Sequence, residues 1–555
     1  MNNIFEQNQL WLKHVKGFWK KDLEAAQNDE NEIKDRFYKS LEFGTGGLRG
    51  IIGSGSNRMN IYTVKKASYG LGEYIVSNND NPSIAISYDS RNFSYEFAHA
   101  AAEVFSSLKI KVHIFSTLNP TPLLSFAVRS LKCDAGIMVT ASHNPKAYNG
   151  YKVYGSDGCQ LTLEASEAVL QRIDAIQDIF SIKTDTFENY LNQGIINYID
   201  SNVYESFMDN VISCSVSDNQ PKDIKIVYTP LNGTGYIPVT DILRRRGFQN
   251  VNIVPEQELP DGNFETCPYP NPEAAETLAL AIKLADKKNA DLILATDPDC
   301  DRLGIGVRQK GKIKLLTGNE VGILLTDYLL SEKKRLGKLP SKPFIIKTIV
   351  TTDLIYEIAK DYNAKVYDVL TGFKFIGEKL GVIEKQNELD NFILAFEESY
   401  GYMAGAYVRD KDGVVAAMLV AEMAQHYLCQ QKTLIDRLEE IYECYGYNAN
   451  LLKSIEFKGM QGIKEMNEKI EAIRNNSPAA LGKYEIKQFK DYQKGIEGLP
   501  SSNVLSLIVD GGKVLIRPSG TEPKLKIYVL CQAESPSRLK GFSEDLLNAA
   551  LKYFS

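Results

Sequence analysis

Apolar residues recur along the chain with two different spacings. In roughly the first 40 residues they return at helix-like intervals among charged residues, at Ile4, Leu10, Trp11, Val15 and Phe18. That spacing predicts an N-terminal helical segment. Further on, short runs rich in β-branched residues, such as SIAIS at 83–87, KVHIF at 111–115 and GIMV at 136–139, alternate with amphipathic stretches. This alternation is typical of strand–helix–strand units around a mostly parallel sheet.

Three apolar strands run directly into loops of polar, chemically capable residues. The segments are AGIMVTASHNP at 135–145, ADLILATDPDCDR at 290–302 and DNFILAFEESYGY at 390–402, each followed by a candidate helix. Ligands of open α/β sheets bind at the carboxyl ends of strands, so chemistry is expected in these loops. Each alone is also compatible with an ordinary strand–turn–helix connection. Three of them suggest repeated α/β domains that contribute one loop apiece.

The C-terminal region has a different pattern. From about residue 450 onward it contains KVLIRPSGTEPKLKIYVLCQA, in which two strands flank a polar loop, and then a final helix. This predicts a smaller domain with an antiparallel sheet, and polar, Pro-containing stretches near 205–222 and 331–343 are candidate boundaries. We expect three similar mixed α/β domains and a C-terminal α+β domain, at residues 1–210, 211–325, 326–445 and 446–555.

Composition narrows the class of protein. A chain of 555 residues is too long for one core, and 44% apolar with 24% charged residues is ordinary for a soluble globular protein. The eight cysteines are scattered without a CxxC pair, which predicts reduced thiols rather than disulfides or a zinc site. The net charge of −6 argues against nucleic acid, although not against a small anionic substrate. Because the sequence lacks a signal pattern and an 18-residue apolar run, we expect a cytoplasmic protein.

The segment TASHNP at 140–145 offers a candidate nucleophile. Ser142 precedes a tight Asn-Pro turn that could present its hydroxyl. Neighbouring side chains on an extended chain point apart, so His143 need not be its base. An Asn-Pro turn with a capping serine remains the alternative interpretation of this segment on its own.

The segment DPDCDR offers a candidate metal site. Asp297, Asp299 and Asp301 occupy alternate positions, and in an extended loop their oxygens can turn toward one point. Mg²⁺ requires oxygen ligands of this kind, whereas three buried acids without a cation would repel one another. Metal binding is therefore favoured over a solvated acidic turn. Arg302 would lie close by, available to a transferring phosphoryl group.

Two further loops supply groups that suit phosphates and sugars. RPSGTEPK at 517–524 combines cations, hydroxyls and a glycine, which favours a phosphate cradle over an ordinary hairpin turn. In EESYG at 397–401, acids and a serine can bind sugar hydroxyls, or they can mark a helix N-terminus. Lys374 in TGFKFIG and Arg49 in GTGGLRG are further cations beside glycines, and each by itself suggests a surface charge. Combined, the loops provide what phosphoryl transfer onto and off a sugar requires.

Together the four loops resemble those of the α-D-phosphohexomutase superfamily. TASHNP is similar to its phosphoserine loop, DPDCDR to its metal loop, EESYG to its sugar loop and RPSGTEPK to its phosphate loop, in the same order. GTGGLRG, TGFKFIG and EESYG are most similar to the phosphoglucomutase branches, including the phosphopentomutase-like one. The resemblance covers the chain from Gly44 to about Lys526 and implies four domains around a central cleft.

The resemblance also implies roles for residues at the matching positions. Ser142 would carry the phosphoryl group and would bind one Mg²⁺ per chain together with Asp297, Asp299 and Asp301. The catalytic centre would be lined by Arg49, His143, Lys152, Arg302 and Lys374. Of these, Lys374 is the candidate for general acid/base work. Sugar hydroxyls would contact Glu397 and Ser399. The phosphate that is not being transferred would be held by Arg517, Ser519, Gly520 and Thr521.

The implied activity is that of a phosphoglucomutase, with a phosphoserine and a bound glucose 1,6-bisphosphate that also re-primes the enzyme. Phosphomannomutase or phosphopentomutase activity on the same scaffold is the alternative. An aspartyl-nucleophile phosphatase fits ILATDPDCD superficially but leaves TASHNP and RPSGTEPK unused, and a catalytically silent sugar-phosphate-binding protein is a third possibility. We expect a phosphosugar as partner, neither nucleic acid nor membrane, and a monomer or homodimer.

Overall fold

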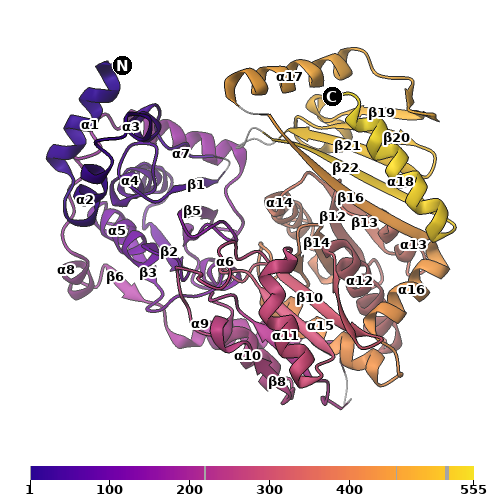
Figure 1. The fold of residues 1–555 in the computed structure, drawn as a ribbon. Coiled ribbons are helices and arrows are strands. Elements are labelled where there is room, and N and C mark those ends of the chain that lie inside the picture. Colours follow the sequence, from indigo (N-terminus) through magenta and orange to yellow (C-terminus); the bar gives the residue numbers. More distant parts are fainter. Residues whose placement is uncertain (1, 45, 218–220, 458, 519–523, 555) are drawn as a thin grey trace.

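The computed structural model describes residues 2–44, 46–217, 221–457, 459–518 and 524–554. Its principal sheets are three mixed α/β sheets followed by one antiparallel sheet at the C-terminus, which confirms the predicted fold class. In Figure 1 the N-terminal third lies at the left, the C-terminal sheet at the upper right, and the middle of the chain below and between them. Within the described residues, no helix combines the length and apolarity that crossing a bilayer requires.

The N-terminal segment is helical, as its spacing predicts, but it forms three helices: α1 (Asn2–His14), α2 (Gly17–Ala25) and α3 (Glu30–Phe37). Trp11 is only 1% exposed and packs edge-on against Phe37 and Tyr62 at ring distances of 5.8 and 5.7 Å. These contacts join the N-terminal helices to the core of the first domain.

The first sheet has six strands. In spatial order they are β1 (Gly47–Ile51), β5 (Tyr148–Gly155), β4 (Ala135–Val139), β2 (Ser83–Tyr88), β3 (Lys111–Ile114) and β6 (Ile196–Tyr198). Strand β2 pairs in parallel with β3 and β4, whereas β5 runs antiparallel between β4 and β1. The helices of this domain are α4 (Ile61–Asn78), α5 (Ser94–Ser107), α6 (Thr121–Ser130), α7 (Leu163–Ala175) and α8 (Phe187–Asn192).

The second sheet has five strands and is followed by a third sheet with four. The second consists of β11 (Lys312–Leu316), β10 (Leu303–Gln309), β9 (Leu292–Thr296), β7 (Ile226–Thr229) and β8 (Val251–Ile253). The third consists of β13 (Lys365–Val369), β12 (Phe344–Thr348), β14 (Phe392–Glu397) and β15 (Gly401–Met403). The accompanying helices are α9 (Ser201–Ser213), α10 (Tyr236–Arg245), α11 (Ala279–Lys288), α12 (Gly318–Arg335), α13 (Leu354–Lys360), α14 (Phe373–Glu384), α15 (Gly413–Leu428) and α16 (Leu434–Tyr445).

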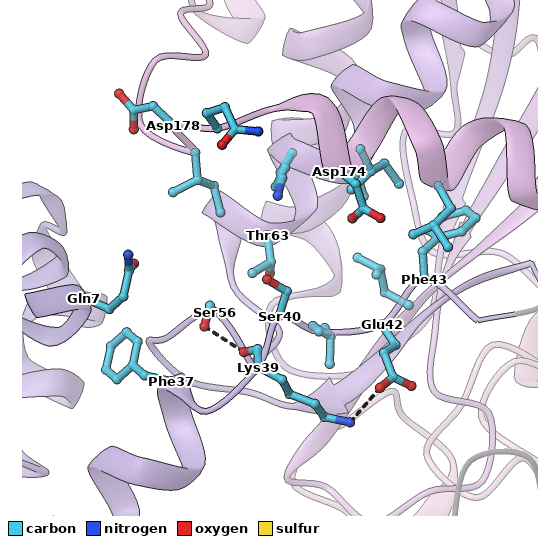
Figure 2. A pocket seen from close by; sticks show the side chains of 18 of the residues that line it. Gln7, Phe37, Lys39, Ser40, Glu42, Phe43, Ser56, Thr63, Asp174 and Asp178 are labelled. Carbon is cyan, nitrogen blue, oxygen red and sulfur yellow. Dashed lines mark hydrogen bonds and ion pairs between the residues drawn. The ribbon is translucent and has the colours of Figure 1, made fainter. Parts of the chain in front are cut away.

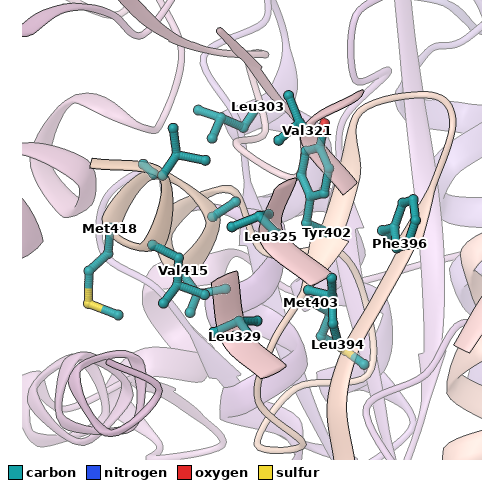
Figure 3. Packing of buried hydrophobic residues seen from close by; sticks show 14 of the residues in the cluster. Leu303, Val321, Leu325, Leu329, Leu394, Phe396, Tyr402, Met403, Val415 and Met418 are labelled. Atoms are coloured by element: carbon teal, nitrogen blue, oxygen red, sulfur yellow. The ribbon is translucent and has the colours of Figure 1, made fainter. Parts of the chain in front are cut away.

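The second and third domains share one hydrophobic core. Figure 3 shows Leu303 of β10 near Val321 of α12 and Tyr402 of β15, and all three belong to a single cluster of buried residues. Burial of apolar side chains is the main favourable contribution to folding, at about 25 cal/mol per Å² of apolar area. A continuous core across two sheets therefore fixes the second domain against the third.

The three polar loops repeat one local structure: a strand, a tight loop and an antiparallel return strand. The pairs are β4–β5, β9–β10 and β14–β15. The candidate helix expected directly after each loop is therefore wrong. Each loop contains one residue in the left-handed region, namely Ser142 (φ 50°), Cys300 (φ 52°) or Tyr400 (φ 66°). The chain reverses there, and the strand after the loop pairs with the strand before it.

The C-terminal domain is built on an antiparallel sheet of five strands with a core of its own. Its strands are β16 (Tyr447–Glu456), β22 (Lys524–Ala533), β21 (Gly512–Pro518), β20 (Leu505–Val509) and β19 (Gln488–Asp491). Further elements are α17 (Gly459–Asn475), the ribbon β17 (Ala480–Leu481) and β18 (Tyr484–Glu485), and α18 (Pro536–Leu551). Short 3-10 turns lie at Pro255–Gln257, Ala275–Leu278, Leu389–Asn391, Tyr492–Lys494 and Ile496–Gly498.

The predicted domain boundaries stay predictions, and two of them fall within helices. The boundaries at 210 and 325 cut α9 and α12, whereas 445 is the last residue of α16. Helix α9 contributes Val203 and Phe207 to the core shared by the second and third domains. The polar stretch at 205–222 therefore begins inside a packed helix and extends past its end at Ser213.

Candidate active site

Ser142 and the aspartate loop meet although 155 positions separate them in sequence. The Ser142 hydroxyl donates a hydrogen bond to Asp297 Oδ2 at 2.7 Å, and Ser142 is only 4% exposed. The loop is shaped locally by Thr140 Oγ1, which accepts a hydrogen bond from the Ser142 amide at 2.8 Å. His143 Nδ1 lies 3.3 Å from the same hydroxyl. The two motifs that suggested a nucleophile and a metal thus form one buried cluster.

The three aspartates of the second hairpin form a site that suits a hard cation. Asp297, Asp299 and Asp301 are buried, and each offers an oxygen within 4.8 Å of the others. Asp297 Oδ1 accepts hydrogen bonds from the amides of Asp301 and Arg302 at 3.1 and 3.0 Å. Among the described residues, Oδ1 of Asp299 and Oδ1 of Asp301 are buried without a hydrogen-bond partner. Buried, unsatisfied carboxylate oxygens are what a divalent cation would bind, so these residues fit a divalent metal site.

Burial and charge act on the aspartates in opposite directions. Burial raises the pKa of Asp297 well above its ordinary value, and the neighbouring Asp299 and Asp301 add to that rise. Burial opposes ionisation of Asp301 too, but Lys411, Lys152 and Arg302 outweigh it and hold the pKa of that carboxyl below its usual range. The cluster therefore combines crowded negative charge with fixed cations.

Two lysines from different domains bind the carboxylates. Lys152 on β5 lies 2.7 Å from Asp299 Oδ2 and 3.2 Å from Asp301 Oδ2, and its predicted catalytic role stays a prediction. Lys411, which the sequence analysis missed, lies 3.2 Å from Asp301 Oδ2 and 3.0 Å from Asp410 Oδ1. Its signal was available in RDKDG at 409–413, a charged run directly before the apolar helix α15.

The sequence analysis also missed Thr121 and Glu273, which help to hold the candidate metal loop. Thr121, at the start of α6, donates its hydroxyl to Asp299 Oδ2 at 2.8 Å and its amide to the Asp299 carbonyl at 2.9 Å. Arg302 donates to Glu273 Oε1 at 2.6 Å. The loop is therefore supported by the first domain as well as by its own.

His143 and Arg49 lie beside Ser142, the candidate nucleophile. Burial lowers the pKa of His143 well below its ordinary value, and the cations Arg302 and Arg49 lower it further. Arg49 is exposed on β1, opposite Gly150 of β5, and donates to Asn144 Oδ1 at 3.2 Å. The imidazole is consequently neutral near pH 7, and Arg49 lies at the rim of the loop that carries Ser142.

The sugar-loop candidates end β14. Glu397 is 5% exposed and pairs with Gly401, and Ser399 lies half-buried in the turn between them. Burial and Glu397 together raise the pKa of Glu398 to about 7, against an opposing influence of Lys526 and Arg517. These cations belong to β22 and β21, so the C-terminal sheet approaches the sugar loop.

The remaining predicted residues are only partly placed. Arg517 pairs with Lys526 across β21 and β22, while Ser519, Gly520 and Thr521 lie outside the described residues. Lys374 lies in the first turn of α14, half-buried, with its ammonium 4.9 Å from the Phe375 ring centre. Burial lowers the pKa of Lys374. Among the described residues, Lys374 forms no hydrogen bond or ion pair with the three aspartates.

A cavity of about 720 Å³ lies elsewhere, between the N-terminal helices and the helices α4 and α7. Figure 2 shows Phe37, Phe43 and Thr63 on its walls and Asp174 and Asp178 from the α7 side. Neither Ser142 nor the three aspartates are among its lining residues. The candidate site is thus identified by its converging polar groups.

The comparisons with known proteins agree with this geometry. Residues 40–179, 205–311, 317–445 and 466–549 match domains I to IV, in order, of the phosphoglucomutase/phosphomannomutase family. The chain is 37% identical over 534 residues to a protein named phosphoglucomutase from Staphylococcus aureus strain MRSA252, covering 94% of this chain and 95% of that protein. A phosphoglucomutase from S. aureus strain USA300 is likewise 37% identical, with the same coverage.

Solved structures share the fold. The open form of pp63/parafusin, a phosphoglucomutase from Paramecium, has a TM-score of 0.69 at 18% identity and covers 93% of this chain and 96% of its own. A phosphoglucomutase/phosphomannomutase family protein from Burkholderia thailandensis has the same TM-score and identity, with 92% and 97% covered. All four domains match in order, and a relative is 37% identical over 94% of this chain. The chain therefore belongs to the phosphoglucomutase/phosphomannomutase family and is an isomerase of the intramolecular phosphotransferase class.

Proposed function

We propose that the chain interconverts glucose 1-phosphate and glucose 6-phosphate through a phosphorylated Ser142. The observation that carries the proposal is the buried hydrogen bond of 2.7 Å from the Ser142 hydroxyl to Asp297. It joins a hydroxyl nucleophile to an oxygen-rich candidate metal site. Relatives named phosphoglucomutase support glucose as the sugar. Mannose and pentose phosphates remain the alternatives that an assay must separate.

The proposed reaction consists of two phosphoryl transfers, one from Ser142 to the sugar and one from the sugar back to Ser142. The bond from phosphorus to Ser142 Oγ breaks as a bond forms to the free hydroxyl of a sugar monophosphate, giving glucose 1,6-bisphosphate. After the bisphosphate turns over in the cleft, its other phosphoryl group moves to Ser142 Oγ and the product leaves. The neutral imidazole of His143, 3.3 Å from Oγ, can accept the hydroxyl proton in that second step. Lys374 is our candidate for proton transfer at the sugar hydroxyl.

Charge is handled by groups from all three α/β domains. Asp297, Asp299 and Asp301 would hold Mg²⁺ together with an oxygen of phospho-Ser142, and when bound the cation supplies positive charge beside the transferring group. Lys152 and Lys411 hold the carboxylates in place through Oδ2 of Asp299 and Oδ2 of Asp301. Positioning and electrostatics provide most of phosphoryl-transfer catalysis, so this arrangement suits the reaction.

The proposal extends to the substrate and the assembly. Glu397 and Ser399 would bind sugar hydroxyls, and Arg517 with Ser519, Gly520 and Thr521 would hold the other phosphate. Added glucose 1,6-bisphosphate should re-prime protein that has lost its phosphoryl group. We further propose a cytoplasmic monomer or homodimer whose partner is a phosphosugar. Size-exclusion chromatography with light scattering would measure the oligomeric state.

The test compares sugars and one substitution. Coupled assays with glucose 1-phosphate, mannose 1-phosphate, glucosamine 1-phosphate and ribose 1-phosphate should give the highest kcat/KM for glucose. Ser142→Ala should lose nearly all activity and should not acquire a phosphoryl group from glucose 1,6-bisphosphate, as read by intact mass. Ser87→Ala, a buried serine of β2, is the control. Full activity in Ser142→Ala, or phosphate release without isomerisation, would contradict the proposal.

A further inference from the structure

The segment Asp89-Ser90-Arg91 directly follows β2 and lies beside the nucleophile loop. Strand β2 pairs in parallel with β4, and β4 runs into Ser142. Arg91 is only 3% exposed. A guanidinium is rarely buried this far unless its charge and its N–H groups are satisfied, so its contacts indicate what it does.

The Arg91 guanidinium binds four backbone carbonyls of the nucleophile loop. Nη2 donates to the carbonyls of Ser142 and Asn144 at 2.5 Å each, and Nη1 donates to those of Pro145 and Tyr148 at 3.1 and 3.2 Å. All four acceptors lie between residues 142 and 148. One side chain therefore holds the backbone on both sides of the Asn-Pro turn.

The same side chain contacts the domain that carries the metal loop. The Arg91 guanidinium lies 5.1 Å from the ring centre of Phe264, which is fully buried in the second domain. Next to it, Asn92 Nδ2 donates to the Gly262 carbonyl at 3.4 Å. A Cβ at Gly262 would lie 2.4 Å from the Asn92 amide nitrogen, so the two backbones approach closely.

Asp89 balances the buried charge without occupying the guanidinium's donors. Its Oδ2 lies 3.5 Å from Arg91 Nε, and both atoms lack a hydrogen-bond partner among the described residues. Its Oδ1 accepts from the Arg91 amide at 2.9 Å and from the Ser94 hydroxyl at 2.7 Å. Asp89 therefore holds the backbone of Arg91, and Nη1 and Nη2 of the guanidinium stay available to donate hydrogen bonds to the loop carbonyls.

We propose that Arg91 is a positioning residue for the nucleophile. Ser142 adopts φ 50°, a left-handed conformation that L-residues disfavour, and the four hydrogen bonds hold the loop in that shape with Oγ directed at Asp297. The stacking on Phe264 sets the loop against the metal-bearing domain. The inference rests on Ser142 as the nucleophile of the proposed function.

A lysine cannot replace this arginine, because a single ammonium cannot reach four carbonyls as a planar guanidinium does. A loss of position by about 1 Å can cost about 100-fold in rate, and we expect Arg91→Lys to lower kcat by that order with an unchanged KM for glucose 1-phosphate. Amide hydrogen exchange should accelerate over residues 141–150. Arg172→Lys is the matched control, because Arg172 also stacks on a tyrosine ring, at 5.4 Å, and also donates to a backbone carbonyl, that of Ala168.

Chemical rescue distinguishes positioning from a merely structural role. In Arg91→Ala, ethylguanidinium should restore part of kcat, whereas ethylammonium at the same concentration should not. If Arg91→Ala fails to fold, Arg91→Lys and its hydrogen exchange decide the question. Wild-type kcat per folded molecule in Arg91→Lys, or unchanged exchange over 141–150, would overturn the proposal. Activity in Ser142→Ala would instead contradict the proposed function, and the exchange measurement would still report the hold of Arg91 on the loop.

Discussion

Lys152 gives a sharp test of the electrostatic balance at the three aspartates. Its ammonium lies 2.7 and 3.2 Å from Asp299 and Asp301 and is 13% exposed. In Lys152→Met, the side-chain volume is nearly kept, but the carboxylates lose one of the two lysines that bind them, and Lys411 and Arg302 remain. Removing one partner of a buried ion pair leaves an uncompensated charge and typically costs about 3–5 kcal/mol.

The expected result is a metal-dependent loss of stability. For a cooperative unit of about 150–250 residues, each kcal/mol shifts Tm by about 2–4 °C, so in EDTA the variant should lose about 6–20 °C. A divalent cation supplies the missing positive charge. Differential scanning calorimetry with EDTA or Mg²⁺ should therefore show a larger Mg²⁺-induced rise in Tm for the variant than for the wild type.

Lys65→Met is the matched control for this experiment. Lys65 also forms a partly buried ion pair in the first domain, with Glu103 at 2.9 Å, but it does not contact the aspartates. Its substitution should lower Tm equally in EDTA and in Mg²⁺. If Mg²⁺ raises Tm by the same amount in Lys152→Met and in the wild type, the view that lysine and metal balance the same charge is wrong.

Three further predictions concern the loops and their supports. The pKa of Glu398 is raised to about 7, so its protonated form stabilises the folded state at low pH, and this contribution is lost as the pH rises through 7. The difference in Tm between the wild type and Glu398→Gln (wild type minus variant) should therefore fall from pH 5 to pH 8. Gly377→Ala should destabilise by about 1–3 kcal/mol because its Cβ would meet Cys159 Sγ at 2.3 Å, whereas Gly381→Ala on the same helix, with nothing within 4 Å, should stabilise slightly; thermal unfolding compares them. Arg517→Ala should lower kcat/KM by a factor that corresponds to about 1.5–3 kcal/mol of lost binding free energy, as steady-state kinetics would measure. Intact mass should show that Ser142 of this variant still accepts a phosphoryl group from glucose 1,6-bisphosphate.

The sequence was informative wherever one local segment carried the chemistry. Ser142 and Asp297 are in contact, as a shared metal site would require, and each lies in a loop that follows a central strand of its sheet. The hairpin returns were not predicted. Strands β5 and β10 are buried almost throughout and lack the alternation of a half-exposed antiparallel strand, so their direction cannot be read from pattern alone.

The carboxylates converge for a reason that differs from the one the spacing suggested. Alternation along an extended loop was the argument, but Cys300 has φ 52° and the segment is a turn. The Cys300 side chain packs in the core shared by the second and third domains. Arg91, Thr121 and Lys411 were missed because their partners lie 51 to 178 positions away in sequence for the first two and on another domain for the third.

The metal loop is held by backbone hydrogen bonds from three domains, and this explains how one site can depend on the placement of all of them. The amides of Thr121 and Thr234 donate to the carbonyls of Asp299 and Pro298, and the Gly413 amide donates to that of Cys300. These donors belong to the first, second and third domains respectively. Any shift of one domain would thus move the aspartates against Ser142.

The C-terminal domain stands in a different relation to the chemistry. It has its own hydrophobic core and meets the third domain through a small separate cluster that includes Ile349, Leu370 and Tyr528. Of its described residues, Arg517 on β21 and Lys526 on β22 oppose the rise in the pKa of Glu398 in the candidate sugar loop. The proposed phosphoryl transfer needs Ser142 and the three aspartates fixed to within fractions of an ångström, whereas the proposed contact of Arg517 with the second phosphate would have to serve two orientations of the bisphosphate. We infer that the interlocked first three domains would supply the fixed geometry, and that a C-terminal domain with a core of its own would supply the adaptable phosphate contact.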